Sequence, residues 1–366
     1  MDLALDDDLL RLQAEAEEVA ADAVARHGAE HDSWICGFSR AFSRELGARG
    51  WLGMSWPVEH GGGGRPPIER LLVTEALISA GAPVAASWFA DRQIGPTLIA
   101  FGSTEQQARH LPAMRAGEST WCIGMSEPDS GSDLASLSTR AVRDGDDWVI
   151  DGHKIWTSFA DRADHCYLIC RTDSVPGRPH LGISELIVPM DAPGVEVRPI
   201  RDLTGARHFN EVWFDGVRVP AGNLVGVEGA AFSQTMRQLE HERGGIDRLV
   251  SNRRLLRWAL ERIDGDDPVV RQEVAALETG YRLGRLMVIR GVLGQAPAGF
   301  SAATKCLCTE YEQRVAALVA RVAGAEAMLG GDLAAGLVYA PAYTIMGGTS
   351  NVLRNIVAER ILGLPR

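Results

Sequence analysis

The 366-residue chain is poor in cysteine, and it contains no long hydrophobic run. Six cysteines are too few for a disulfide framework, and pairs such as Cys166 with Cys170 or Cys306 with Cys308 lack the second Cys or His pair of a zinc site. We therefore expect small, buried, apolar cysteines and no bound metal. Because no apolar run could span a bilayer and the acidic residues 1–8 do not form a secretion signal, we expect a cytoplasmic protein without a membrane partner.

The chain also lacks blocks of charge of one sign. Its net charge is −11, and acidic and basic residues are mixed along its length. This balance argues against a nucleic-acid partner, and a polyanionic ligand would need local cationic side chains. Aromatic residues make up only 6% of the chain, but 46% hydrophobic residues over this length can build two or three domains with buried interfaces.

The sequence pattern changes twice along the chain. Residues 1–117 are rich in helix formers, residues 118–228 contain short β-prone runs separated by turn residues, and residues 229–366 are again helical with a break at 264–268. The pattern predicts a protein that is mainly α with a central β-domain. Its parts are an N-terminal helical domain, a small β-sandwich or barrel, and a C-terminal helical bundle.

Local signals place several elements within these segments. Ser103 and Gln106 form the pattern of a capping box, which predicts that a helix begins there. Asp151 and Gly152 are predicted to form a hairpin turn between two short strands. The strands are expected at 148–150, 154–156, 166–170, 185–188, 195–197 and 211–220.

Two neighbouring motifs in the β segment suit a flat ligand with polar edges. Residues 121–139 place Ser, Gly and Asp in a turn-rich loop, which can present backbone amides and hydroxyls. Residues 154–158 add the Trp156 indole and the Ser158 hydroxyl. An indole can lie against an aromatic ring system while a hydroxyl bonds a ring nitrogen, so the pair suits a flat heteroaromatic cofactor. Each motif by itself is equally typical of an ordinary loop and strand.

These motifs occur in order with segments at 95–112, 200–220 and 347–366, and together they resemble the signatures of the acyl-CoA dehydrogenase superfamily over nearly the whole chain. The resemblance implies that fold, FAD as the cofactor, an acyl-CoA substrate and an electron-transfer flavoprotein as the electron acceptor. It also implies flavin contacts for six residues: Met125 and Ser126 at the pyrimidine edge, Ser132 at the pyrophosphate, Trp156 and Ser158 at the isoalloxazine, and Thr349 near the adenosine end.

The reaction that the resemblance implies needs a base for the proton alpha to the thioester. Many family members carry a Glu in a C-terminal Tyr-Glu-Gly-Thr motif, but residues 346–349 here read Met-Gly-Gly-Thr. Another branch of the family places the base on the first long helix after the β-domain, just before an Arg. By this resemblance Glu242 is the catalytic base and Arg243 binds substrate, although a structural ion pair is an alternative for either residue. Arg248, Arg253 and Arg254 could meet coenzyme A phosphates, or they could equally form a solvated helix face.

Helical geometry separates Glu242 from Glu240. On a wheel of 100° per residue, Glu242 falls within an apolar stripe and Glu240 falls just outside it. A carboxylate on such a stripe is costly unless it is paired or functional. The stripe is formed by Phe232, Met236, Leu239, Ile246 and Leu249.

The chain departs from homotetrameric members of the family at one motif. Their Arg-x-x-Phe-Gly sequence, which reaches a partner's flavin, is absent from residues 259–273. In this respect the chain resembles a subunit of the actinobacterial heterotetrameric (α2β2) acyl-CoA dehydrogenases of steroid and cholesterol side-chain breakdown. We therefore expect an unlike partner subunit and a bulky acyl chain. Two alternatives remain: an acyl-CoA oxidase of the same fold, or a catalytically silent subunit that completes another chain's flavin site.

Overall fold

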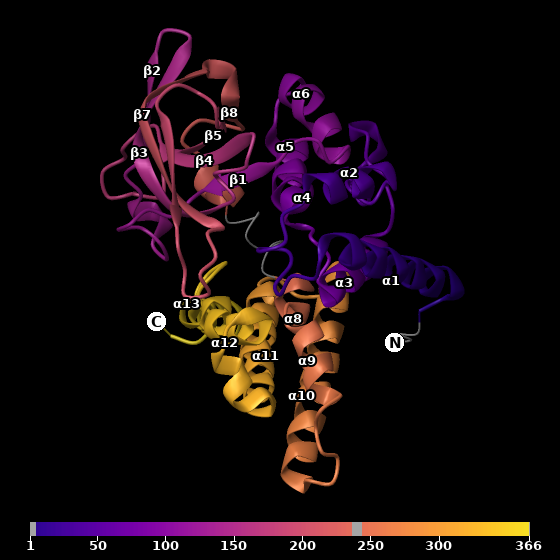
Figure 1. Ribbon diagram of the computed structural model, residues 1–366. Helices are drawn as coiled ribbons and strands as arrows, with labels where there is room; N and C mark the ends of the chain where they lie inside the picture. Colours follow the sequence, from indigo (N-terminus) through magenta and orange to yellow (C-terminus); the bar gives the residue numbers. More distant parts are fainter. Residues whose placement is uncertain (1–4, 236–243, 366) are drawn as a thin grey trace. The chain divides into compact units, whose positions relative to one another are not determined.

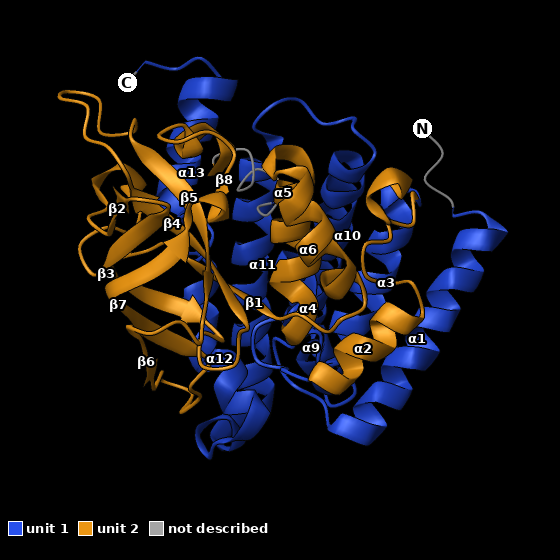
Figure 2. Ribbon diagram, turned by 90° about the horizontal axis from the view of Figure 1, so that it is seen from above, with its two compact units in different colours: residues 1–39, 65–85, 240–366 blue, residues 40–64, 86–239 orange. Residues whose placement is uncertain are grey.

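The computed structural model describes residues 5–235 and 244–365, which fold into two compact units (Figures 1 and 2). Unit 1 contains residues 1–39, 65–85 and 240–366, and unit 2 contains residues 40–64 and 86–239. The N-terminal helical segment contributes to both units.

In the described residues of unit 1, the named secondary-structure elements are all helices. The break predicted at 264–268 is confirmed, because Asp267 caps the helix that follows and Pro268 occupies its first turn. None of the described helices is long and apolar enough to cross a membrane. The helices of unit 1 are α1 (Asp7–His27), α3 (Pro67–Ala80), α8 (Asp247–Val250), α9 (Arg253–Leu260), α10 (Pro268–Val292), α11 (Phe300–Ala323), α12 (Gly331–Tyr343) and α13 (Ser350–Ile356).

Unit 2 combines short helices with all the strands. Its helices are α2 (Arg40–Ala48), most of α4 (Ala85–Phe89), α5 (Gly95–Phe101) and α6 (Thr104–Arg115). The capping box predicted at the start of α6 is confirmed, since Ser103 accepts from the Gln106 amide and the Gln106 side chain accepts from the Ser103 amide. Its two reciprocal bonds explain why this helix begins after Ser103.

The strands of unit 2 form one mixed sheet of eight strands. Its order is β6-β7-β3-β2-β4-β5-β8, and β1 pairs with β4 in parallel. The strands are β1 (Trp121–Gly124), β2 (Arg140–Asp144), β3 (Asp147–Ser158), β4 (His165–Arg171), β5 (Ile183–Pro189), β6 (Val195–Ile200), β7 (Phe209–Pro220) and β8 (Leu224–Val225).

Both faces of strand β4 are buried, and they face different cores. Tyr167 packs in a cluster with Leu98 of α5, whereas Leu168 packs in a second cluster with Ile150 of β3 and Val212 of β7. Alternation along the strand explains why neighbouring residues enter different cores. Because β4 and β7 are separated by other strands in the sheet order, their shared core shows that the sheet curls on itself.

The turn predicted at Asp151 and Gly152 is wrong. Strand β3 continues through both residues, and the hairpin turn between β2 and β3 lies earlier, after Asp144. The register of β3 against β7 shifts between Ile150 and Gly152. A Cβ on Gly152 would lie 2.4 Å from the Thr139 hydroxyl oxygen. The glycine therefore marks a bulge and a close approach of another segment, two features that share a turn's local signature.

Candidate functional site

Four of the predicted cofactor residues lie together where β1 and β3 end. Met125 and Ser126 directly follow β1, while Trp156 and Ser158 are among the last three residues of β3. The Ile155 amide donates to the Ser126 carbonyl at 2.9 Å, which places the two segments side by side. The sequence motifs, about thirty residues apart, thus form one surface of unit 2.

The backbone of β3 is irregular at this surface. Its register shifts between Lys154 and Thr157, and Trp156 has φ 62° within that shift. A non-glycine residue in the left-handed region is uncommon and costs about 1 kcal/mol or more. The Trp156 side chain is 55% exposed, and its ring meets Phe209 edge-on at 5.8 Å between centroids. The bulge therefore turns a large indole out of the sheet into a position from which it can contact a ligand.

A buried ion pair lies behind this surface. The Lys154 ammonium is 2.8 Å from the Glu127 carboxylate, and both side chains are almost fully buried. Burial would raise the pKa of Glu127, but the Lys154 charge and several hydrogen bonds outweigh it and lower the pKa to about 2. Burial also lowers the pKa of Lys154, and Glu127 opposes this. Both side chains are therefore charged, and each charge offsets the cost of burying the other.

The same two side chains also bind the loop between β1 and β2. Glu127 accepts from the Ser138 amide at 2.6 Å, the Ser138 hydroxyl at 2.7 Å and the Thr139 amide at 2.8 Å. Lys154 donates to the Met125 carbonyl at 3.0 Å. Both residues stand inside the predicted motifs, but sequence reasoning assigned them no role. The available signal was a lysine in alternation with the buried apolar residues Trp148 and Ile150 of the same strand.

Polar groups at this surface are available to a ligand. Within the described ranges, the Ser126 amide and the Ser158 hydroxyl have no hydrogen-bond partner in the protein. Ser158 is 8% exposed as a whole residue. Two open donors beside an exposed indole fit the edge and face of a flavin. Ser132, the residue predicted at the pyrophosphate, lies in an exposed bend of the same loop.

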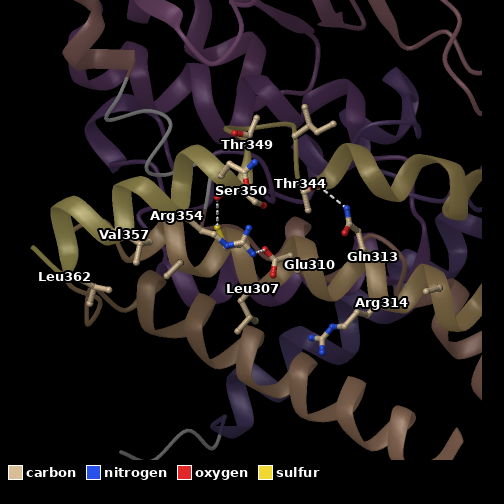
Figure 3. Close-up of a pocket in the computed structure, with 16 residues that line it drawn as sticks. Leu307, Glu310, Gln313, Arg314, Thr344, Thr349, Ser350, Arg354, Val357 and Leu362 are labelled. Carbon is tan, nitrogen blue, oxygen red and sulfur yellow. Dashed lines mark hydrogen bonds and ion pairs between the residues drawn. The ribbon is translucent and has the colours of Figure 1, made fainter. Parts of the chain in front are cut away.

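Thr349 belongs to unit 1, where it caps α13 by accepting from the Val352 amide. It lines a groove of about 1270 Å³ along α11 and α13 (Figure 3). Gly347 and Gly348 precede it with φ 64° and 94°, and the buried Lys305 ammonium donates to the Gly348 carbonyl at 2.8 Å. The position of the family's C-terminal base is therefore a glycine in the left-handed region, which favours this residue type.

Glu242 and Arg243 lie outside the described residues. The last described residues before that stretch are fixed to the sheet, because Gln234 and Thr235 donate to Glu185 of β5 at 2.9 and 2.8 Å. Glu185 also accepts from the Tyr167 hydroxyl. Burial raises the pKa of Glu185 to about 7.

Among the described residues, no group of three or more His, Cys, Asp or Glu side chains could hold a metal.

Family models match the chain in three consecutive stretches. The acyl-CoA dehydrogenase N-terminal domain matches residues 6–118, the middle domain residues 122–217 and the C-terminal domain residues 229–362. The chain belongs to the acyl-CoA dehydrogenase family. It is accordingly an oxidoreductase of a family of flavoproteins, and the fold expected from the sequence is confirmed.

Individual acyl-CoA dehydrogenases resemble the chain along most of its length. Acyl-CoA dehydrogenase IpdE1 of Mycobacterium tuberculosis is 38% identical over 354 residues, covering 93% of this chain and 91% of the relative. A solved structure named Tcur3481-Tcur3483 steroid ACAD has 33% identity and a TM-score of 0.90, with complete coverage of both chains. The ChsE4-ChsE5 complex from Mycobacterium tuberculosis has 30% identity and a TM-score of 0.86, also with complete coverage of both chains.

Proposed function

We propose that this acyl-CoA dehydrogenase uses FAD to introduce an α,β double bond into a bulky acyl-CoA, of the kind carried on a steroid side chain. The observation that carries the proposal is the surface at the ends of β1 and β3. There the open donors of Ser126 and Ser158 flank the outward-turned Trp156, in a chain that matches the family's three domain models over most of its length.

Different residues of the chain bind different parts of the cofactor. Met125 and Ser126 meet the pyrimidine edge, while Ser158 donates to the ring and Trp156 covers it. Ser132 meets the pyrophosphate and Thr349 the adenosine end. When bound, the flavin supplies an acceptor for the hydride that leaves the β carbon. The protein must therefore exclude water from the ring and hold the acyl chain against it.

Glu242 is the proposed base, which takes the proton from the α carbon. A carboxylate suits this task when burial raises its pKa towards the working pH. Arg243 is assigned to substrate binding. In a Glu242→Gln variant, we expect flavin to remain bound while reduction by substrate is lost, whereas Arg243→Lys should raise KM more than it lowers kcat. Full reduction of the flavin by substrate in Glu242→Gln would exclude this residue as the base.

We further propose an unlike subunit as partner, which contributes the arm that residues 259–273 lack. Two observations support it. The groove beside Thr349 is open to solvent and includes the apolar side chains of Ile345 and Leu362, which are 62% and 64% exposed. The solved relatives Tcur3481-Tcur3483 and ChsE4-ChsE5 are both named as pairs of chains. The unlike subunit is the occupant proposed for this groove, and an electron-transfer flavoprotein is the proposed electron acceptor.

Expression of the chain alone and with candidate partner subunits tests the proposal. We expect little flavin absorbance alone and a yellow complex with the correct partner, which steroid-type acyl-CoAs should bleach faster than straight-chain ones. A stoichiometrically yellow, active homo-oligomer would contradict the unlike partner. A complex that binds flavin, and whose flavin is bleached by substrate equally well with Glu242→Gln and with the unsubstituted chain, would indicate a silent subunit. Hydrogen peroxide as a stoichiometric product would identify an oxidase.

A further inference from the structure

Lys154 connects a buried positive charge to the peptide group between Met125 and Ser126. Its ammonium donates to the Met125 carbonyl at 3.0 Å and to the Glu127 carboxylate at 2.8 Å. The carbonyl of Met125 and the amide of Ser126 belong to one peptide group. That amide has no acceptor within the described part of the protein, and it lies at the surface assigned to the flavin.

The physical consequence follows from the polarisability of peptide groups. A charged donor on the carbonyl oxygen withdraws electron density from the amide nitrogen and makes its N–H a stronger donor. The effect is larger here than at the surface because Lys154 is fully buried, so water screens its charge little. The Ser126 amide is therefore a better donor to an electron-rich ring edge than an ordinary backbone amide.

We propose that Lys154 is a positioning residue that polarises the Met125–Ser126 peptide towards the flavin pyrimidine edge and so favours the reduced, more negative cofactor; this rests on the proposed flavin site. Glu127 is its counterpart, which holds the ammonium on the Met125 carbonyl and fixes the loop through Ser138 and Thr139. The two residues have opposite charges, so they have opposite effects on the flavin while sharing one structural task.

This opposition supplies the test. In the flavin-loaded form, alone or with its partner subunit, the reduction potential is measured by dye equilibration for the unsubstituted protein, Lys154→Met and Glu127→Gln. We expect the potential to fall in Lys154→Met and to rise in Glu127→Gln, since one removes a positive and the other a negative charge. FAD binding, followed by flavin fluorescence, should weaken about tenfold in Lys154→Met, because the Ser126 amide becomes a weaker donor to the flavin.

The matched control is Glu185→Gln, which alters another buried carboxylate of unit 2 that accepts three side-chain hydrogen bonds outside the loop 125–139. It should lower the melting temperature and leave the potential unchanged. If Lys154→Met does not fold, the double variant Glu127→Gln/Lys154→Met removes both charges together and should still show a lower potential, because the polarised amide is lost.

The outcomes separate this inference from the proposed function. Shifts of the same sign in Lys154→Met and Glu127→Gln, or no shift in either, would show a purely structural pair and overturn the inference while leaving the flavin site intact. Absence of FAD from the protein in every form would overturn the proposed function and this inference with it.

Discussion

Replacement of Asp32 by Asn should remove much of the pH dependence of stability in unit 1. Asp32 is fully buried, and the Ser251 hydroxyl donates to its Oδ1 at 2.5 Å. Among the described residues, its Oδ2 has no partner. Burial raises the pKa of Asp32 to about 7, against opposing effects of Ser251 and Arg248. Asn is a suitable replacement because Asp32 has φ 48°, a conformation that Asn tolerates.

The magnitude follows from the difference between the folded and unfolded states. Raising the pKa of Asp32 from 3.8 to about 7 corresponds to about 4 kcal/mol, since one pKa unit is worth about 1.4 kcal/mol. The folded state holds the proton of Asp32 more tightly than the unfolded state does. The stabilisation that results is fully present below pH 3.8 and is lost as the pH rises towards 7. About 3 kcal/mol of this loss falls between about pH 5 and pH 8.5.

Urea unfolding followed by circular dichroism at these two pH values measures the effect. The unsubstituted protein should lose about 3 kcal/mol more than Asp32→Asn between them, because all other titrating groups are common to both proteins. Asp22→Asn, which changes an exposed aspartate of α1, is the matched control and should track the unsubstituted protein. If Asp32→Asn shows the same pH dependence as the control, the buried carboxyl is not protonated in the folded state and the argument fails.

Three further substitutions test other parts of the structure. Trp156→Gly should weaken FAD binding without lowering the melting temperature, because glycine relieves φ 62°; unchanged FAD titrations would exclude the indole from the site. Glu75→Gln should cost about 2 kcal/mol in urea unfolding, since the carboxylate accepts from Tyr281 and pairs with the partly buried Arg285 at 2.9 Å. Thr349→Ala should cost about 1 kcal/mol through the lost cap of α13 while Thr349→Ser does not, and equal melting curves would contradict the capping role.

Local signals predicted those parts of the fold that depend on local chemistry. Ser103 with Gln106 and Asp267 with Pro268 mark helix starts because a cap satisfies amides within the same turn. Gly152 shows where such signals fail. An aspartate followed by a glycine looks the same in the sequence whether the chain reverses there or only passes close to another segment. In the structure, the contact with Thr139 identifies Gly152 as a close approach.

The candidate site was predictable in part for the same reason. Ser126 and Trp156 belong to motifs that resemble family signatures, so the sequence alone could propose them as site residues. The pairing of Glu127 with Lys154 could not, because it depends on how the loop after β1 lies against β3. A buried charge is acceptable only with a partner, and the partner of Glu127 lies 27 residues further along the chain.

Arg248 is a second buried charge whose surroundings the sequence did not predict. The sequence suggested either a contact with coenzyme A phosphates or a solvated helix face, but its side chain is 2% exposed. It lies 3.4 Å from the Asp247 carboxylate and over the Trp34 ring at 4.7 Å. A helical wheel assigns arginine to the outside because it includes only neighbours about one turn away, whereas Trp34 lies far away in the sequence, near the N-terminus. The burial of Arg248 therefore depends on a contact with Trp34 that no local pattern contains.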